Sequence, residues 1–205
     1  MRPLCDALVP PLCAACGGGR CDGEELLCRR CARRLASAES LRDTGPAGVD
    51  RAWSSAPHEA VARDLVAALK FRRLLPVAGL MAERIQALAP AWVLSGEIVP
   101  VPTAPLRSLL RGFDPAAELA AELAGRSGRP LRRCLARRGS GRQVGRSRAQ
   151  RLGGPPRIHA SGEVPRSVVL VDDVLTTGAT LSSCAQALRA AGAARVVAVT
   201  FSRRL

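Results

Sequence analysis

The sequence predicts an α/β protein in which a mostly parallel sheet is flanked by helices and follows a small module rich in cysteine. Residues 168–171 are four consecutive apolar residues, a pattern typical of a central parallel strand covered on both faces. Short apolar runs alternate with helical repeats through residues 49–205, and two Cys-x-x-Cys pairs lie in residues 1–40. A chain of 205 residues is long enough for one core and one small extra module. We therefore expect two domains with these bounds.

The N-terminal module contains the pairs Cys13/Cys16 and Cys28/Cys31. A two-residue spacer forms a tight knuckle that places both thiolates at neighbouring corners of a tetrahedron, so the pairs predict a four-cysteine zinc ribbon. Four thiolates leave no position for water, and the expected role of the zinc is structural. Cys21, which lies between the pairs, is a less favoured substitute ligand. A redox-active pair would need a surrounding βαβ pattern, which is missing here.

One or two amphipathic helices are expected between residues 49 and 93. Val61, Leu65 and Leu69 form the apolar stripe of one helix, and Lys70 follows at its end. Lys70 is the only lysine in a chain whose formal net charge is +14, so arginine carries the other positive charges. The position of Lys70 suits either an interaction with the helix dipole or a functional role, and both interpretations stay open.

The next apolar segment, residues 98–103, predicts a short strand that ends in a bend, because its prolines cannot donate to a strand ladder. Asp114 is a suitable N-cap, with Pro115 in the first helical position, for a helix that ends near Gly125. A weaker strand is expected over residues 131–136.

The segment from 137 to 157 is predicted to be a flexible basic loop. No acidic residue occurs between Glu122 and Glu163, whereas arginine is frequent. Such a concentration of charge must be solvated or must meet an anion. Solvent, pyrophosphate and the backbone of a nucleic acid remain three alternatives. The stretch between Phe113 and Phe201 has no aromatic residue, which argues against the stacking of single-stranded bases on this segment.

The residues that follow the 168–171 run give the clearest indication of function. Asp172 and Asp173 stand at the expected carboxyl end of the strand, and the loop 176–180 opens a helix with apolar residues at helical spacing. Ligands of open α/β sheets bind at this end of the strands, and the free N–H groups of a helix start suit a phosphate. Two adjacent carboxylates can hold a ribose diol, or a magnesium ion through water. The pattern predicts a sugar-phosphate site; the alternative is an ordinary strand–loop–helix unit with a solvated acidic turn.

Residues 168–180 resemble the phosphoribosyl-pyrophosphate signature of the type I phosphoribosyltransferases. The resemblance implies that the acid pair contacts the ribose hydroxyls, that the loop wraps the 5-phosphate, and that magnesium accompanies the ligand. It also implies that the bend after the 98–103 strand meets pyrophosphate. Enzymes that salvage 6-oxopurines carry aspartate at the position of Thr176, so this activity is disfavoured and the acceptor stays unknown. The expected phosphoribosyl-pyrophosphate-binding residues are Lys70, Thr103, Asp172, Asp173, Thr176, Thr177, Gly178, Ala179 and Thr180.

The whole chain resembles the ComF/GntX family of competence-associated proteins, in which a zinc ribbon precedes a type I phosphoribosyltransferase-like core. The resemblance implies a phosphoribosyltransferase-like protein that binds phosphoribosyl pyrophosphate and Mg and acts in DNA uptake, natural competence or nucleotide metabolism. The alternative is a non-catalytic, single-stranded-DNA-binding accessory of a competence helicase. The motifs that carry the resemblance are the two cysteine pairs, the signature, Leu69-Lys70-Phe71, Val99-Pro100-Val101-Pro102 and Arg111-Gly112-Phe113.

We expect a cytoplasmic protein without a membrane span. No stretch approaches the ~18 consecutive apolar residues of a spanning helix. An acid and a proline interrupt the N-terminal residues 1–6 too early for a secretory signal. In a reducing compartment, the eight cysteines are expected to bind metal or to stay free thiols.

Overall fold

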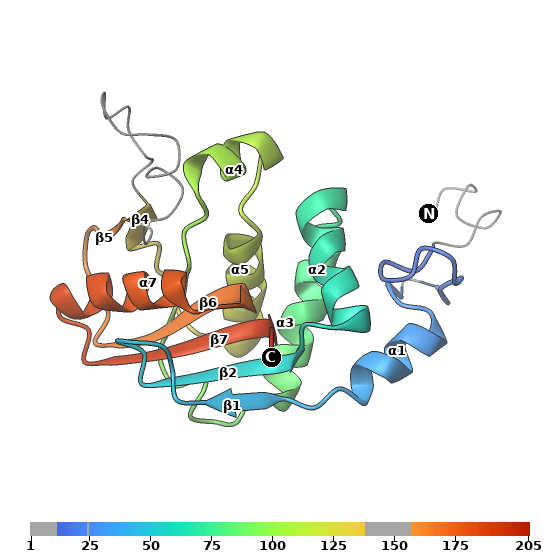
Figure 1. Cartoon of the computed structure of the whole chain (residues 1–205), viewed down its shortest axis with the longest axis horizontal. Helices are drawn as coiled ribbons and strands as arrows, with labels where there is room; N and C mark the ends of the chain where they lie inside the picture. The colour runs from blue at the N-terminus through green and yellow to red at the C-terminus, as the bar shows by residue number, and fades with distance from the viewer. Residues whose placement is uncertain (1–11, 24, 138–156) are drawn as a thin grey trace.

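A computed structural model describes residues 12–23, 25–137 and 157–205 (Figure 1). Its main feature is a five-stranded sheet with the order β1-β2-β7-β6-β3. Only the edge strand β1 is antiparallel to its neighbour; the other neighbours are parallel. The predicted α/β class is therefore confirmed. In sheet order, the strands are β1 (Leu41–Asp43), β2 (Arg51–Pro57), β7 (Arg195–Arg203), β6 (Ser167–Leu175) and β3 (Glu97–Pro100).

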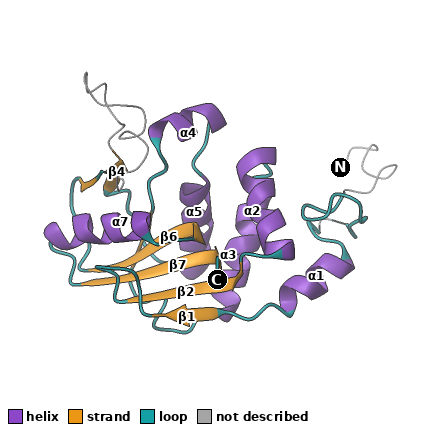
Figure 2. Cartoon of the chain, viewed as in Figure 1, coloured by secondary structure: helices purple, strands orange, loops and turns teal. Residues whose placement is uncertain are grey.

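Helices cover both faces of this sheet (Figures 1 and 2). Helices α2, α3 and α5 share a buried apolar cluster with one face, and α7 shares a second cluster with the other. Among the described residues, no helix combines the length and the apolar character that crossing a membrane requires. The helices are α1 (Arg29–Ala36), α2 (Ala60–Arg72), α3 (Pro76–Leu88), α4 (Pro105–Arg111), α5 (Pro115–Ser127) and α7 (Ala179–Ala190).

Strand β6 is buried on both faces, as its apolar run predicted. Val169 and Val171 join the cluster of α2, α3 and α5, whereas Val168 and Leu170 join the cluster of α7. This alternation follows from the two-residue period of a strand. The strand continues beyond Val171 and includes both acids, because the equally long β7 supplies ladder partners up to residue 203.

Strand β2 was not predicted, although it lies inside the sheet, between β1 and β7. Its interior contains Ser54 and Ser55, which interrupt an apolar pattern. Both hydroxyls are buried and satisfied: Ser54 Oγ lies 2.7 Å from Thr200 Oγ1, and Ser55 donates to the Phe201 carbonyl at 2.6 Å. Paired in this way, the polar side chains are tolerated in the interior.

The region after α5 differs from expectation. The helix continues past Gly125 and ends where Gly128 takes a positive φ of 65°. The weaker strand is β4 (Leu135–Arg137), and it pairs antiparallel with β5 (Ile158–Ala160) in a separate two-stranded sheet. The predicted basic loop falls almost wholly on residues 138–156, outside the described residues.

The cysteine-rich segment packs against the α2 side of the core. Cys13, Leu27 and Leu35 belong to the same buried cluster as Trp53 and Leu65. The cysteine-rich segment and α2 therefore share one continuous core, and the packing in this core stabilises both.

Candidate functional site

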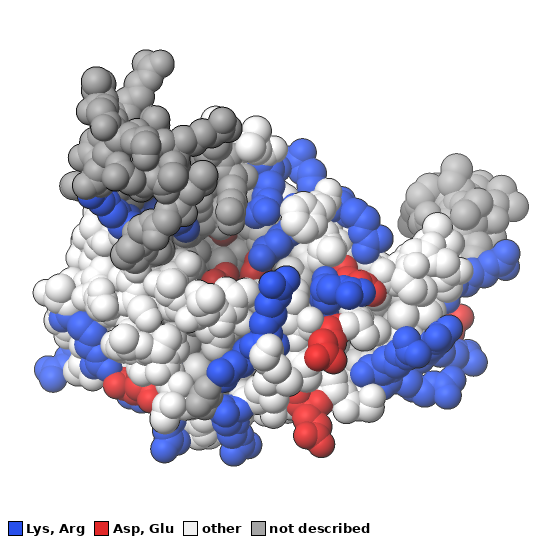
Figure 3. Space-filling model, viewed as in Figure 1, with Lys and Arg blue, Asp and Glu red and all other residues white. Residues whose placement is uncertain are grey.

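Two acids lie near the carboxyl end of β6, at the edge of the sheet where α/β proteins bind ligands. Asp173 is 4% exposed, and Asp172 is half-buried. The Asp173 N–H donates to Asp172 Oδ1 at 2.9 Å. In Figure 3, acidic side chains lie recessed below α4, with Lys and Arg side chains around them. Both acids belong to strand β6, which is hydrogen-bonded to β7, and so they do not lie on a turn.

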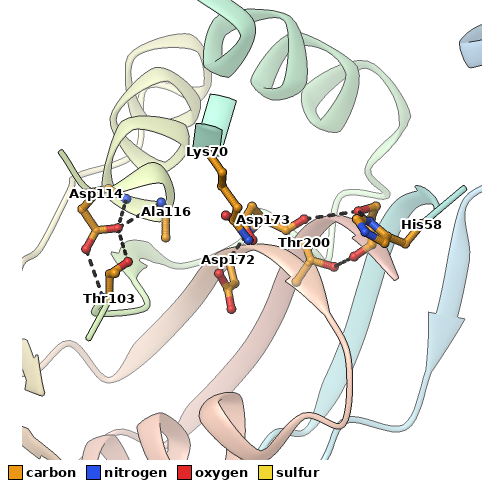
Figure 4. Close-up of polar contacts among 10 residues, drawn as sticks. His58, Lys70, Thr103, Asp114, Ala116, Asp172, Asp173 and Thr200 are labelled. Carbon is orange, nitrogen blue, oxygen red and sulfur yellow. Dashed lines mark hydrogen bonds and ion pairs between the residues drawn. The ribbon is translucent and has the colours of Figure 1, made fainter. Parts of the chain in front are cut away.

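Lys70 reaches this site from the last turn of α2. Its Nζ lies 2.6 Å from Asp173 Oδ1, although 103 residues separate the two in the sequence (Figure 4). The side chains of Lys70 and Asp173 are 23% and 6% exposed, so solvent screens this ion pair only weakly. The structure therefore brings Lys70 to the predicted acid pair.

The carboxyl of Asp172 is held largely protonated at neutral pH. Burial, together with the negative charge of Asp173, raises its pKa to about 8, although Lys70 and the Asp173 N–H oppose the shift. A polar ligand that donates hydrogen bonds to Asp172 would stabilise the charged form and reverse this shift.

The loop between β6 and α7 presents a free helix start and exposed hydroxyls. Gly178 is the N-cap of α7 with a φ of +75°, and Thr176 and Thr177 are exposed beside it. The Ala179 N–H has a long contact of 3.5 Å with Thr177 Oγ1, and no side chain of Gly178 can cap the helix. The first N–H groups of a helix lack intrahelical partners, so this helix start suits a phosphate.

Thr103 lies in the bend after β3, as expected, but its donors have a partner within the protein. Its N–H donates to Asp114 Oδ2 at 3.1 Å and its hydroxyl to Asp114 Oδ1 at 2.8 Å (Figure 4). Asp114 also accepts from the N–H groups of Ala116 and Ala117 and so is the predicted N-cap of α5. The contact of Thr103 with pyrophosphate stays a prediction.

Sequence reasoning missed a polar chain beside the acid pair. His58 Nδ1 lies 2.8 Å from Ser202 Oγ, which lies 3.5 Å from the Asp173 carbonyl. Burial, Arg204 and Lys70 lower the pKa of His58, so the ring is neutral at pH 7. The hydroxyls of Thr200 and Ser202, two residues apart in β7, were the available signal, since such residues share one face of a strand.

The two cysteine pairs converge as predicted. The Sγ atoms of Cys13, Cys16, Cys28 and Cys31 all lie within 4.8 Å of one another, and those of Cys16 and Cys28 are 4.0 Å apart. Tetrahedral zinc with Zn–S bonds of about 2.3 Å requires sulfurs about 3.8 Å apart. The donor set and its spacing fit one zinc ion.

The backbone of the first knuckle also favours thiolate. The N–H groups of Gly18 and Gly19 lower the pKa of Cys16 to about 6. Gly19 leaves room for the second pair, since a Cβ at this position would lie 2.7 Å from Cys28 Sγ. Cys21 is buried nearby but is not one of the four clustered thiols.

Comparison with known families gives one match, in the C-terminal part of the chain. A family model described as "Phosphoribosyl transferase domain" matches residues 109–205. The matched region contains the acid pair and the loop before α7, whereas Lys70 and Thr103 precede it. Comparison with curated proteins finds no match.

Two solved structures are similar to part of this chain. "Structure of the allosteric regulatory enzyme of purine biosynthesis" is 25% identical over 60% of this chain, with a TM-score of 0.40. A glutamine phosphoribosylpyrophosphate amidotransferase from B. subtilis, complexed with ADP and GMP, is 24% identical over 64% of this chain, with a TM-score of 0.39. The matches span 24% and 26% of those longer chains. The acid pair and the loop before α7 lie inside residues 109–205, the range that matches the model of the phosphoribosyl transferase domain.

Proposed function

We propose that the protein binds phosphoribosyl pyrophosphate with magnesium and transfers its phosphoribosyl group to an acceptor that is still unknown. One observation supports this proposal above the others. The acid pair, a half-buried lysine and the N-terminus of α7, which has no side-chain cap from Gly178, lie at one edge of the sheet.

Each end of such a ligand has a complementary group. The 5-phosphate meets the N-terminus of α7 and the hydroxyls of Thr176, Thr177 and Thr180, with Gly178 and Ala179 supplying backbone contacts. The ribose diol meets Asp172 and Asp173. Lys70 and the Thr103 bend face the pyrophosphate side of the sugar. The position of these groups at the sheet edge supports the assignments.

The chain contributes mainly position and charge to the transfer. As the bond from C1 to the pyrophosphate oxygen breaks, its electron pair leaves with pyrophosphate, and the acceptor lone pair forms the new bond to C1. Magnesium, held through water by Asp172 and Asp173, would neutralise part of the charge on pyrophosphate. Lys70 adds a fixed positive charge near the leaving group, and the two carboxylates orient the sugar.

The acid pair provides the direct test. Replacing both residues by asparagine in one variant (D172N with D173N) keeps their shape but removes both ionisable carboxyl groups. We expect affinity for phosphoribosyl pyrophosphate with Mg²⁺ to fall by about 100-fold or more in calorimetry, because charge-assisted hydrogen bonds are lost. Asp64→Asn, which replaces a partly exposed acid on the same helix as Lys70, is the control. Unchanged affinity in the double variant would refute the site, and pyrophosphate release with a panel of nucleobases would identify the acceptor.

We also propose that Cys13, Cys16, Cys28 and Cys31 hold one structural zinc ion. The converging thiols and the thiolate-stabilising backbone support it. By resemblance, this cluster and the transferase domain together suggest the ComF/GntX family, a cytoplasmic location, and a role in natural competence or nucleotide metabolism beside a competence helicase.

A second candidate function is the binding of single-stranded DNA. Phe71 is 73% exposed, and the guanidinium of Arg111 lies 5.5 Å from its ring centroid. Aromatic and arginine side chains of this kind stack bases, and the exposed arginines of α1 suit phosphates. The test is binding of a fluorescent oligonucleotide at increasing salt, with Phe71→Ala as the variant. No binding at low ionic strength would eliminate this candidate.

A further inference from the structure

The ammonium of Lys70 occupies an oxygen that the proposed ligand needs. Its Nζ lies 2.6 Å from Asp173 Oδ1, and the carboxylate of Asp173 is 6% exposed. A ribose hydroxyl that donates to this oxygen must compete with the ammonium for it. Among the described residues, Asp173 is the acid within ion-pair distance of Lys70. A ligand that displaces Lys70 therefore leaves a partly buried charge without its partner, which is unfavourable.

The 5-phosphate of the ligand is expected on the other face of the sheet from Lys70, so it cannot replace Asp173 as the anionic partner of the ammonium. Its expected site is the N-terminus of α7, and α7 packs on the face of the sheet that carries Leu170. Lys70 comes from α2, which packs on the opposite face with Val169 and Val171. A second anionic group is needed on the α2 side of the sugar. In a pentose bound by its diol and its 5-phosphate, the substituent on C1 is the remaining position for that group.

We propose that Lys70 determines ligand specificity: the site accepts a pentose 5-phosphate that carries a diphosphate on C1 and rejects one that carries the 5-phosphate alone. In the free protein, Lys70 closes the diol site by holding Asp173. The diphosphate draws the ammonium away from Asp173, so the diol site opens only for the complete ligand. This inference rests on the proposed function, because it assumes that the acid pair binds the diol.

A lysine at position 70 is suited to exchanging one anionic partner, the Asp173 carboxylate, for another, the diphosphate. The chain has 31 basic residues, and Lys70 is the only one that is not arginine. A lysine ammonium is a compact point charge with three donors on a flexible stem, so it can move from a carboxylate to a phosphate by changing rotamers. A planar guanidinium prefers one fixed, bidentate partner.

Calorimetry with two ligands tests the inference. Phosphoribosyl pyrophosphate and ribose 5-phosphate are each titrated with Mg²⁺ into the unmodified protein, Lys70→Gln and Arg63→Ala. Arg63 is an exposed cation on the same helix, paired with Asp64, and serves as the control. We expect the unmodified protein and R63A to prefer phosphoribosyl pyrophosphate by about 100-fold or more. In K70Q, affinity for phosphoribosyl pyrophosphate should fall by about 100-fold, whereas affinity for ribose 5-phosphate should stay the same or rise.

The outcomes separate the inference from the proposed function. If K70Q weakens both ligands equally, or if the unmodified protein binds both equally, Lys70 is not selective, although the phosphoribose site stands. If the unmodified protein binds neither ligand, the proposed function itself fails. The amide of glutamine can still donate to Asp173, and thermal unfolding checks that K70Q is folded.

A measurement on the unmodified protein is independent of any variant. Inorganic pyrophosphate should increase the affinity for ribose 5-phosphate by about 5-fold or more, since it withdraws Lys70 from Asp173. Simple charge repulsion between the two anions predicts the opposite sign. Absence of this positive coupling would overturn the inference.

Discussion

Pro46 lies directly against Gly178, the N-cap of α7. A Cβ on residue 178 would lie 2.7 Å from the Pro46 Cβ, and Gly178 has a φ of +75°. A left-handed backbone and a close neighbour thus both require glycine here. The contact fixes the loop whose N–H groups face the proposed 5-phosphate.

Gly178→Ala is therefore expected to destabilise the protein by about 1–3 kcal/mol, since alanine adds backbone strain and overlap with Pro46. It should also weaken phosphoribosyl-pyrophosphate binding by displacing the loop. Gly125→Ala is the matched control: Gly125 lies within α5, and a Cβ there meets nothing within 4 Å. That control should gain about 0.5–1 kcal/mol from helix propensity. Urea denaturation compares the two, and equal stability would contradict the prediction.

The zinc proposal predicts a metal content of one ion per chain. Cys28→Ser should lose the metal and lower the melting temperature, because the remaining thiols cannot close the coordination shell. Cys21→Ser should keep it, since Cys21 lies outside the cluster of four thiols. Elemental analysis of the purified proteins, followed by thermal unfolding with and without a chelator, checks both. If the Cys21 variant also lost its zinc, the four clustered cysteines would not be the correct ligand set.

The sequence predicted those features that neighbouring residues determine. The apolar run of β6, the cap formed by Asp114 and Pro115, and the two cysteine knuckles each depend on a few adjacent side chains. The long-range partners could not be predicted. Lys70 and Asp173 are separated by 103 residues, and only the packing of α2 on the sheet brings them together.

Strand β2 could not be predicted because its polar residues conceal a buried strand. Ser54 and Ser55 look like surface residues in a one-dimensional pattern, yet their hydroxyls are buried and bonded to β7. A polar residue is acceptable in a central strand when its partner comes from the neighbouring strand. That partner cannot be identified from the sequence until the strand order is known.

The raised pKa of Asp172 predicts a pH-dependent stability. Its ordinary value is 3.8 and its value in the folded protein is about 8, so the folded state holds the proton more tightly than the unfolded state. The contribution of this group to stability is full below about pH 3.8 and is lost as the pH rises to about 8. Asp172→Asn should therefore raise the melting temperature relative to the unmodified protein, by little at pH 5 and by more at pH 8.

Thermal scans from pH 5 to pH 9 measure this difference. Above about pH 8 the gain should level off, because Asp172 is then charged in both states. Asp64→Asn, which replaces a partly exposed acid of α2, is the comparison variant in these scans. A gain that is independent of pH would mean that the asparagine acts through packing and not through charge.

Asp114 connects the bend after β3 to the start of α5, and its removal should have two effects. Asp114→Ala eliminates the N-cap, which costs about 1–2 kcal/mol, and leaves the Thr103 N–H without its acceptor, which costs about 1–3 kcal/mol more. Thr103→Val removes only the hydroxyl and should cost about 1 kcal/mol. Urea denaturation measures both losses.

Pyrophosphate binding by the same two variants shows which group meets the ligand. If Asp114 positions the bend, D114A should weaken pyrophosphate more than T103V, because only D114A releases the Thr103 N–H from its anchor. If T103V loses binding while D114A keeps it, the hydroxyl contacts pyrophosphate directly and the carboxylate competes with the ligand for it. Since Asp114 is itself negative, its repulsion of pyrophosphate opposes the first result. A weaker affinity in D114A would therefore mean that positioning outweighs charge.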